Sequence, residues 1–419
     1  MMYPIKSLKK VYSEINAPPS KSYTNRALII SALADGKSIL RNVLFSDDTV
    51  YMINALRDFG IKIISKKDRL IVYGTGGRIK KPKGRIYTGN AGTTMRFITA
   101  FSALAKDKVI ITGDKRMQER PIQDLLNALN QIGVNAYSKK NNGFPPVVVN
   151  GGFLYGGNVS IHGTLSSQFI SAIMMIGPLA EKGIKLDVIG ELTSKPYADL
   201  TIEAMKNFGA EVKNQMYKRF VVSPTGYFPI SYFIEGDASN TSYFFASAAI
   251  TNGRVKVSRI NPYSVQGDIR FVDLLGRMGC EVVKGDDYIE VIGNDLNGIA
   301  VDMNSMPDTV QTLAIVSLFA KGKTKIFNVK NLRLKETDRI KALVTELRKL
   351  GADIKELEDG LIISPKKLHP AIIETYNDHR MAMSFAVAGL MISGIKIKNP
   401  DCVKKSFPDF WERFERMYG

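Results

Sequence analysis

The sequence is poor in the residues that build disulfide scaffolds and metal sites. Its 419 residues include two cysteines, Cys280 and Cys402, and three widely separated histidines, His162, His369 and His379. Two cysteines argue against a disulfide framework and against a cysteine-based zinc site, and the scattered histidines do not indicate a structural metal. We therefore expect a reduced protein without a structural metal.

Long hydrophobic runs are also missing. The N-terminal stretch MMYPIKSLKKVYSE has no apolar core of the kind that a signal peptide needs. No uninterrupted apolar run elsewhere is long enough to span a bilayer. These two features predict a cytoplasmic protein that has no membrane partner.

Negative charge is scarce relative to positive charge. The chain holds 58 Lys and Arg residues against 40 Asp and Glu residues, a net charge of +18. Such an excess attracts anions, which include nucleic acids, anionic membranes and phosphorylated small molecules. Charge alone does not choose among these, so an RNA-binding or RNA-processing protein is one alternative at this point.

An apolar helix followed by a strand occurs six times, in segments 26–40, 96–111, 169–186, 243–257, 312–326 and 385–397. Glycine suits the left-handed residue that commonly follows a helix. It occupies that place in five copies, at Gly36, Gly183, Gly253, Gly322 and Gly394, and Asp107 takes the place in the sixth. An amphipathic helix, a glycine and a hairpin lie between these copies. The glycines of this second element are Gly60, Gly133, Gly209, Gly279 and Gly351.

Six α/β repeats predict an α/β (α+β) protein of two similar domains with three repeats each, because six exceed what one core usually holds. The chain ends on a sixth amphipathic helix that has no hairpin after it, so we expect segment 3–17 to supply strand material there. The expected domains are 1–19 plus 236–419, which contains both termini, and 20–235. A single large domain with a degenerate repeat is the alternative.

The N-terminal ends of the apolar helices are polar and partly cationic. They read SKSYTNR (20–26), GNAGTTMR (89–96), TLSSQ (164–168), GDASNTS (236–242), NSMPDT (304–309) and YNDHR (376–380). Ordinary capping explains any single end. All six together, with Lys21, Arg26, Arg96 and Arg380 among them, favour anion binding, because a helix N-terminus carries partial positive charge and free N–H groups. Equivalent ends of repeated units are expected to face a positive cleft between the domains, for which a monomer is sufficient.

Four loops add further cations. These cations are Lys115, Arg116, Arg120, Lys195, Arg333, Lys335, Arg339, Lys404 and Lys405. Glu336 lies among such cations, and a surface salt bridge or a catalytic role would explain it equally well. Asp308 at a helix start would serve as an N-cap or as a base, and His379 would serve as a capping or structural histidine.

Ten short stretches then occur in an order that resembles the 5-enolpyruvylshikimate-3-phosphate synthase family from end to end. They are PPSKSYTNRAL, GNAGTTMRF, RMQERPI, SSQF, SKPY, GDAS, MPD, NLRLKETDR, NDHRMAM and KSFPDF. The resemblance implies the enolpyruvyl transferase fold, with two domains of three βαβαββ repeats and an interdomain active-site cleft. It also implies transfer of the enolpyruvyl group of phosphoenolpyruvate to the 5-hydroxyl of shikimate 3-phosphate, by addition and then elimination of phosphate, without a metal or an organic cofactor.

The resemblance also implies roles for individual residues. Asp308 would take the proton of the 5-hydroxyl, Glu336 would protonate the C3 methylene, and Lys21 would assist proton transfer. Shikimate 3-phosphate would contact Lys21, Ser22, Arg26, Ser166, Ser167, Gln168, Ser194, Tyr197, Asp308, Asn331 and Lys335. Phosphoenolpyruvate would contact Lys21, Asn90, Gly92, Arg120, Gln168, Arg339, Arg380 and Lys405.

One residue departs from the family pattern. Phe97 follows Met95 and Arg96 where the family commonly has proline, and phenylalanine does not fix φ as proline does. We expect a shifted helix start, and with it a shifted Gly92, near the place where the inhibitor glyphosate competes with phosphoenolpyruvate in this family.

Two rival functions differ in what they require of the sequence. The related enzyme that acts on UDP-N-acetylglucosamine typically has a cysteine in the loop that corresponds to 113–121, and this loop has none. A nucleic-acid site would need stacking side chains in its groove. The cations here instead lie at helix starts beside Asp308 and Glu336, so we expect no nucleic-acid partner.

Overall fold

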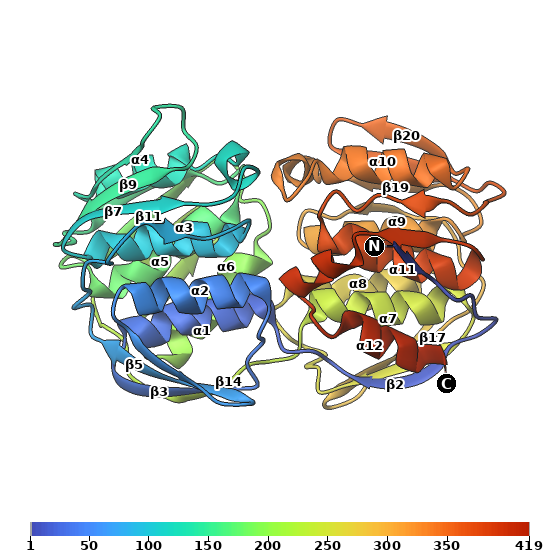
Figure 1. Cartoon of the computed structure of the whole chain (residues 1–419), viewed down its shortest axis with the longest axis horizontal. Helices are drawn as coiled ribbons and strands as arrows, with labels where there is room; N and C mark the ends of the chain where they lie inside the picture. The colour runs from blue at the N-terminus through green and yellow to red at the C-terminus, as the bar shows by residue number, and fades with distance from the viewer. Residues whose placement is uncertain (1, 419) are drawn as a thin grey trace. The chain divides into compact units, whose positions relative to one another are not determined.

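The computed structural model describes residues 2–418 of the chain, whose course can be followed in Figure 1. Contacts divide the chain into two compact units, and each has a hydrophobic core of its own. The first unit comprises Met1–Pro18 and Glu235–Gly419, and the second comprises Pro19–Ile234. Within residues 2–418, no helix is both long and apolar enough to cross a membrane.

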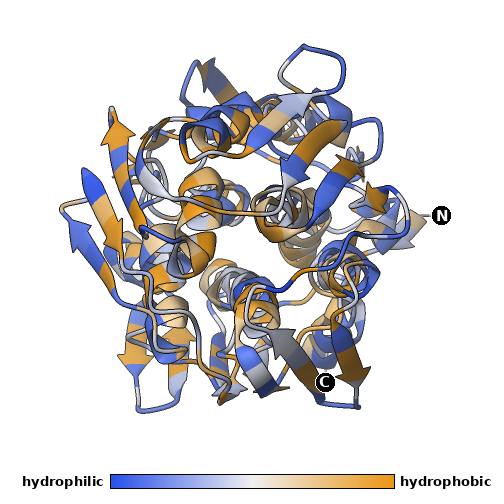
Figure 2. Ribbon diagram, turned by 90° about the vertical axis from the view of Figure 1, so that its left-hand side faces the viewer, coloured by the Kyte–Doolittle hydropathy of each residue, from blue (hydrophilic) through white to orange (hydrophobic). Residues whose placement is uncertain are grey.

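Six apolar helices form the centre of the repeats, three in each unit, and they are buried on nearly all sides. They are α1 (Lys21–Leu33), α3 (Gly92–Phe101), α5 (Ser167–Ile176), α7 (Ala238–Ile250), α9 (Val310–Ser317) and α11 (His379–Met391). The amphipathic helices are α2 (Asp47–Asp58), α4 (Gln123–Gln131), α6 (Pro196–Asn207), α8 (Phe271–Met278), α10 (Arg339–Lys349) and α12 (Phe410–Glu415). In Figure 2 hydrophobic residues recur along helices and strands, and many connecting loops are hydrophilic.

The strands of the second unit form three four-stranded sheets. Their orders are β14 (Ser231–Phe233), β3 (Asp35–Arg41), β5 (Arg69–Thr75), β4 (Lys62–Ser65); β6 (Ile86–Tyr87), β7 (Asp107–Thr112), β9 (Val147–Gly151), β8 (Asn135–Ser138); and β10 (Gly157–His162), β11 (Ile184–Ile189), β13 (Arg219–Val222), β12 (Val212–Gln215). In each sheet the first pair is parallel and the others are antiparallel.

The first unit repeats this pattern with two four-stranded sheets and one three-stranded sheet. Their orders are β2 (Tyr12–Asn16), β15 (Arg254–Ser258), β17 (Tyr288–Ile292), β16 (Glu281–Lys284); β18 (Ala300–Asp302), β19 (Thr324–Phe327), β21 (Gly360–Ser364), β20 (Asp353–Leu357); and β22 (Ile372–Ile373), β23 (Lys396–Lys398), β1 (Met2–Pro4). The predicted fold of βαβαββ repeats is thereby confirmed.

The N-terminal segment supplies strands to two different sheets. Strand β1 pairs antiparallel with β23 and completes the last repeat, which has no hairpin of its own after α12. This was expected of segment 3–17, but β2 goes elsewhere and pairs parallel with β15. In exchange β14, which precedes α7 in the chain, pairs parallel with β3 of the second unit. Each unit therefore contains a strand from the part of the chain that leads into the other.

The turn after each apolar helix follows the predicted pattern with one correction. Asp107 has φ +70°, so it takes the left-handed place that glycine fills in other copies. The prediction for Gly253 is wrong, because Asn252 is the left-handed residue there, with φ +49°. Gly253 is required for a different reason: a Cβ at this position would lie 2.1 Å from the carbonyl oxygen of Val11.

Candidate active site

In the first unit, Arg339 gathers three carboxylates at the start of α10. The residue is 1% exposed. Its Nε lies 2.8 Å from Asp378 Oδ2, Nη1 lies 3.0 Å from Asp308 Oδ1, and Nη2 lies 2.8 Å from Glu336 Oε2. Burial lowers the pKa of Arg339, but the charges of Asp378, Glu336 and Asp308 outweigh burial and raise it. Arg339 therefore stays charged in the core of this unit.

A second arginine binds the other oxygen of Asp308. Arg380, the second residue of α11, is 3% exposed, and its Nη2 lies 2.8 Å from Asp308 Oδ2. Its Nη1 donates to the Tyr243 hydroxyl at 3.3 Å. Asp308 lies in the short 3-10 helix Pro307–Thr309, whose N-cap is Met306, so it does not act as the simple cap that was one alternative.

Glu336 is enclosed rather than lying in a surface salt bridge. Its side chain is 9% exposed and lies between Arg339 and Lys405, whose Nζ is 3.8 Å from Glu336 Oε1. Lys405 ends the 3-10 helix Pro400–Lys405 and is 8% exposed. Three cations and three carboxylates thus form one network, which is completed by Asp378, the N-cap of α11.

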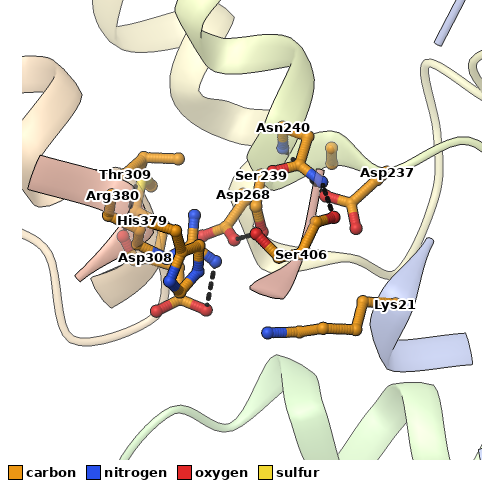
Figure 3. A network of polar contacts seen from close by, with 12 residues as sticks. Lys21, Asp237, Ser239, Asn240, Asp268, Asp308, Thr309, His379, Arg380 and Ser406 are labelled. Carbon is orange, nitrogen blue, oxygen red and sulfur yellow. Dashed lines mark hydrogen bonds and ion pairs between the residues drawn. The ribbon is translucent and has the colours of Figure 1, made fainter. Parts of the chain in front are cut away.

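Beside this network lies a carboxyl group that the sequence did not reveal. Asp268, in the 3-10 helix Gly267–Arg270, is hydrogen-bonded to the Ser239 hydroxyl in the first turn of α7 (Figure 3). Burial raises the pKa of Asp268 to about 7, the charge of Asp308 adds to this, and Arg380 opposes it. QGDIR is not at the start of an apolar helix, so no pattern singled Asp268 out.

His379 and Asp237 mainly shape the helix starts. His379 is buried, and its Nδ1 lies 3.6 Å from Oδ1 of Asp378. Asp237 accepts a hydrogen bond from the backbone N–H of Asn240 at 2.8 Å and so caps α7. Asn240 in turn donates to the Ser406 carbonyl at 3.2 Å, just after Lys405. Figure 3 shows these side chains converging from α7, α11 and the segment around Ser406.

In the second unit, Arg120 lies against the turn before α3. It is 5% exposed, and its Nη1 lies 3.3 Å from the side-chain oxygen of Asn90. A Cβ at Gly92 would lie 2.6 Å from Arg120 Nη2, so the missing side chain leaves room for the guanidinium group. On α5, the Gln168 amide donates to the Thr93 hydroxyl at 3.3 Å. The structure therefore brings these predicted residues together.

Arg26 serves the core of the second unit. It is 2% exposed, and its Nε donates to the Thr201 hydroxyl at 2.7 Å. Its Nη2 donates to the Tyr197 carbonyl at 3.1 Å, and its guanidinium lies 5.3 Å from the Phe97 ring centroid. Burial lowers the pKa of Arg26 to about 10. Arg26 thus links α1, α3 and α6.

The other predicted positions divide into helix starts and surface pairs. Lys21 lies 3.0 Å from Asp48, and Ser166 caps α5 by accepting from the Gln168 N–H at 3.2 Å. Ser22, Ser167 and Ser194 lie at or before the starts of α1, α5 and α6, and Asn331 and Lys335 lie at the 3-10 helix Lys330–Leu334. Several loop cations pair with acids outside both clusters: Arg116 with Glu119, Lys195 with Glu191, Arg333 with Asp338 and Glu356, and Lys404 with Asp401.

Comparison with known proteins identifies the family to which the chain belongs. The family model of EPSP synthase (3-phosphoshikimate 1-carboxyvinyltransferase) matches residues 5–414. The chain belongs to this family. A 3-phosphoshikimate 1-carboxyvinyltransferase of Enterobacter sp. (strain 638) is 45% identical, and the match covers 99% of this chain and 98% of that protein. The enzyme of the same name from Histophilus somni (strain 2336) is 44% identical, with 98% and 97% covered.

Solved structures agree with the sequence comparison. An EPSP synthase from Acinetobacter baumannii superimposes with a TM-score of 0.83 at 27% sequence identity, covering 99% of this chain and 98% of that one. The chain is therefore a transferase that moves the enolpyruvyl group of phosphoenolpyruvate to shikimate 3-phosphate, a step of aromatic amino acid biosynthesis. The alternative acceptor, UDP-N-acetylglucosamine, is not favoured by these matches.

Proposed function

We propose that the network around Arg339 carries the proton transfers of this reaction. In the addition step, Asp308 accepts the proton of the shikimate 5-hydroxyl while that oxygen bonds to C2 of phosphoenolpyruvate. Glu336 donates a proton to C3, which turns the methylene into a methyl group. In the elimination step, the Glu336 carboxylate takes a proton back from C3, the C2–C3 double bond forms again, and the bond from C2 to the phosphate oxygen breaks, so that phosphate leaves with the proton that Asp308 holds. Lys21 balances charge during these transfers.

The observation that carries this proposal is the pairing of Asp308 and Glu336 through one arginine. Arg339 holds both carboxylates, at 3.0 and 2.8 Å, so their positions are fixed with respect to each other. Preorganised groups of this kind need no rearrangement as charge develops, which is a large source of catalysis. Positioned acids and bases typically contribute a further ~10²–10⁴-fold each.

An anionic substrate would change the state of Glu336. In this structure Arg339 and Lys405 both lie against its carboxylate. We propose that phosphoenolpyruvate takes these two cations as partners, together with Arg380. The negative charge of phosphoenolpyruvate then offsets the cations that favour ionised Glu336, so that it can hold the proton that it donates.

The remaining substrate contacts follow from the resemblance. We propose that phosphoenolpyruvate is bound by Arg339, Arg380 and Lys405 of the first unit and by Lys21, Asn90, Gly92, Arg120 and Gln168 of the second. For shikimate 3-phosphate the proposed contacts are Lys21, Ser22, Arg26, Ser166, Ser167, Gln168, Ser194, Tyr197, Asp308, Asn331 and Lys335. Arg26 fits least well, because its guanidinium is occupied by protein groups.

Three finer proposals concern partners. Glyphosate competes with phosphoenolpyruvate for the binding site near Gly92 and Arg120. The enzyme acts as a monomer, because one chain carries every proposed contact. It does not take nucleic acid as a partner, since Arg339, Arg380 and Lys405 are each at most 8% exposed and lie among carboxylates.

Substitution of the two carboxylates tests the proposed roles. Asp308→Asn and Glu336→Gln keep the shape of the side chains but remove the ability to exchange the proton. We expect each to reduce turnover by about 10²–10⁴-fold while the protein stays folded. Glu358→Gln, which alters an exposed carboxylate that pairs with Lys330, is a matched control with normal turnover. Near-normal turnover of either folded variant would overturn the assignment.

A further inference from the structure

We propose that Glu346 is a positioning residue that fixes the N-terminus of α11 and, through it, Arg380. The inference rests on the proposed function, in which Arg380 binds phosphoenolpyruvate. Glu346 lies in α10, and among residues 2–418 its carboxylate binds Lys349, Glu374 and Tyr376, none of which belongs to the network around Arg339. It acts on the site through the backbone that leads into α11.

The Glu346 carboxylate is fully buried, with 0% exposure. Oε2 accepts a hydrogen bond from the backbone N–H of Glu374 at 3.0 Å, and Oε1 accepts one from the Tyr376 hydroxyl at 2.7 Å. Lys349 Nζ lies 2.8 Å from both oxygens. A buried carboxylate is unfavourable unless it is hydrogen-bonded and paired, and this one meets both conditions by binding the segment just before α11.

That segment holds an unfavourable backbone conformation. Tyr376 and Asn377 are consecutive non-glycine residues in the left-handed region, with φ +53° and +55°. Side chains disfavour this region, and such residues persist only where the surroundings hold them. The next residue, Asp378, is the N-cap of α11, and Arg380 follows two positions later. The left-handed pair therefore sets the direction in which α11 begins.

Helix α10 holds this turn from both sides. Arg339 and Glu346 are seven residues apart, about two helical turns, so they lie on the same face of α10. Glu346 binds Glu374 just ahead of the turn and the Tyr376 side chain within it, and Arg339 binds Asp378 after it. Because Arg380 reaches Asp308 from the first turn of α11, a shift of this turn would move its guanidinium away from the network.

Two variants of different severity test the inference. Glu346→Gln removes the charge, and Tyr376→Phe removes a single hydroxyl group and leaves the rest of the protein intact. For both we expect the KM for phosphoenolpyruvate to rise by about ten-fold, a change equivalent to ~1.4 kcal/mol. The KM for shikimate 3-phosphate should change by less than about two-fold, since the displaced group serves the other substrate. A purely structural role would lower the active fraction and leave both KM values unchanged.

A matched control is Glu290→Gln, which alters another buried glutamate, on β17, whose partner Arg254 lies on the neighbouring strand β15. It should leave both KM values unchanged. Arg380→Lys separates this inference from the proposed function. If Arg380→Lys raises the KM for phosphoenolpyruvate and neither Glu346→Gln nor Tyr376→Phe does, the inference is wrong and the proposed function stands. If Arg380→Lys has no effect on that KM, the assignment of Arg380 fails, and the inference fails with it.

The double variant Glu346→Gln with Arg380→Lys provides the second readout. If Glu346 acts through Arg380, the two changes are not independent, so their combined effect on the KM for phosphoenolpyruvate should be smaller than the product of the single effects. Effects that multiply would show that Glu346 does not act through Arg380.

Discussion

At the scale of single residues, Gly92 and Arg120 show how a missing side chain makes room for a cation. A Cβ at position 92 would lie 2.6 Å from Nη2 and 2.9 Å from Nη1 of Arg120. These atoms end a flexible side chain, so the guanidinium would move rather than the backbone. We expect Gly92→Ala to raise the KM for phosphoenolpyruvate by about ten-fold and to leave the unfolding free energy within ~0.5 kcal/mol.

Steady-state kinetics and urea unfolding of that variant check both expectations. Gly84→Ala is a suitable control, because a Cβ there meets nothing within 4 Å. An unchanged KM for phosphoenolpyruvate in Gly92→Ala would contradict the account of this contact.

Asp268 makes stability depend on pH. Its pKa is raised to about 7 in the folded protein, by burial first and then by Asp308, from 3.8 as the ordinary value. The folded state therefore binds more protons than the unfolded state between about pH 4 and pH 7, so the unfolding free energy falls as pH rises across this range and levels off above pH 7. Asp268→Asn lacks that loss. Relative to the natural protein, we expect it to gain about 2–3 kcal/mol of unfolding free energy between pH 5 and pH 8.

Urea titrations at pH 5, 6, 7 and 8 measure this difference. A constant difference between the two proteins across that range would show that Asp268 does not titrate there. Asp295→Asn is a control at an exposed position, where the pairing with Lys321 lowers the pKa of the carboxyl, so the titration lies below this pH range.

The sequence could predict that arginines lie at helix starts, but not what each of them binds. Arg26 and Arg380 both occur in the first two turns of apolar helices. Arg26 is held in the core by Thr201, Tyr197 and Phe97, while Arg380 reaches Asp308. These partners come from other helices, which local patterns do not place. Asp268 could not be predicted from the sequence for the same reason.

At the scale of elements, the repeats were predictable because helix ends and turns are decided locally. Glycine at the end of an apolar helix indicates a left-handed residue, and Asp107 at φ +70° shows that the backbone requires this conformation even where glycine is absent. The prediction of a left-handed residue at Gly253 is wrong. Its conformation is ordinary, and the glycine is needed because β2 is preceded by Val11, which the chain brings beside it from the far N-terminus.

Asp107→Gly tests the cost of that left-handed residue. Glycine reaches φ +70° without the steric clash of a Cβ, and this gain exceeds the entropy that glycine loses on folding. The exposed pair of Asp107 with Lys81, at 3.9 Å, contributes little. We expect the variant to unfold with a free energy about 0.5–1 kcal/mol higher, measured by urea denaturation. Destabilisation would mean that the Asp107 side chain makes a contact worth more than the strain.

At the scale of the whole molecule, the chain pairs one strand within a unit, β2 or β14, just before it passes to the other unit. Strand β2 lies in the first unit although it leads into α1, and β14 lies in the second unit although it leads into α7. The sequence predicted six repeats and two domains, because each repeat carries its own pattern. It did not predict which sheet receives β2, since strand pairing over such distances leaves no local signal.

The central claim is that this chain transfers enolpyruvyl from phosphoenolpyruvate to shikimate 3-phosphate with its own side chains. The most direct measurement is phosphate release from phosphoenolpyruvate in the presence of a chelator, with shikimate 3-phosphate and UDP-N-acetylglucosamine supplied separately. We predict release that depends on shikimate 3-phosphate alone and persists in chelator. If neither acceptor supported release, or if UDP-N-acetylglucosamine alone did, the account would be contradicted.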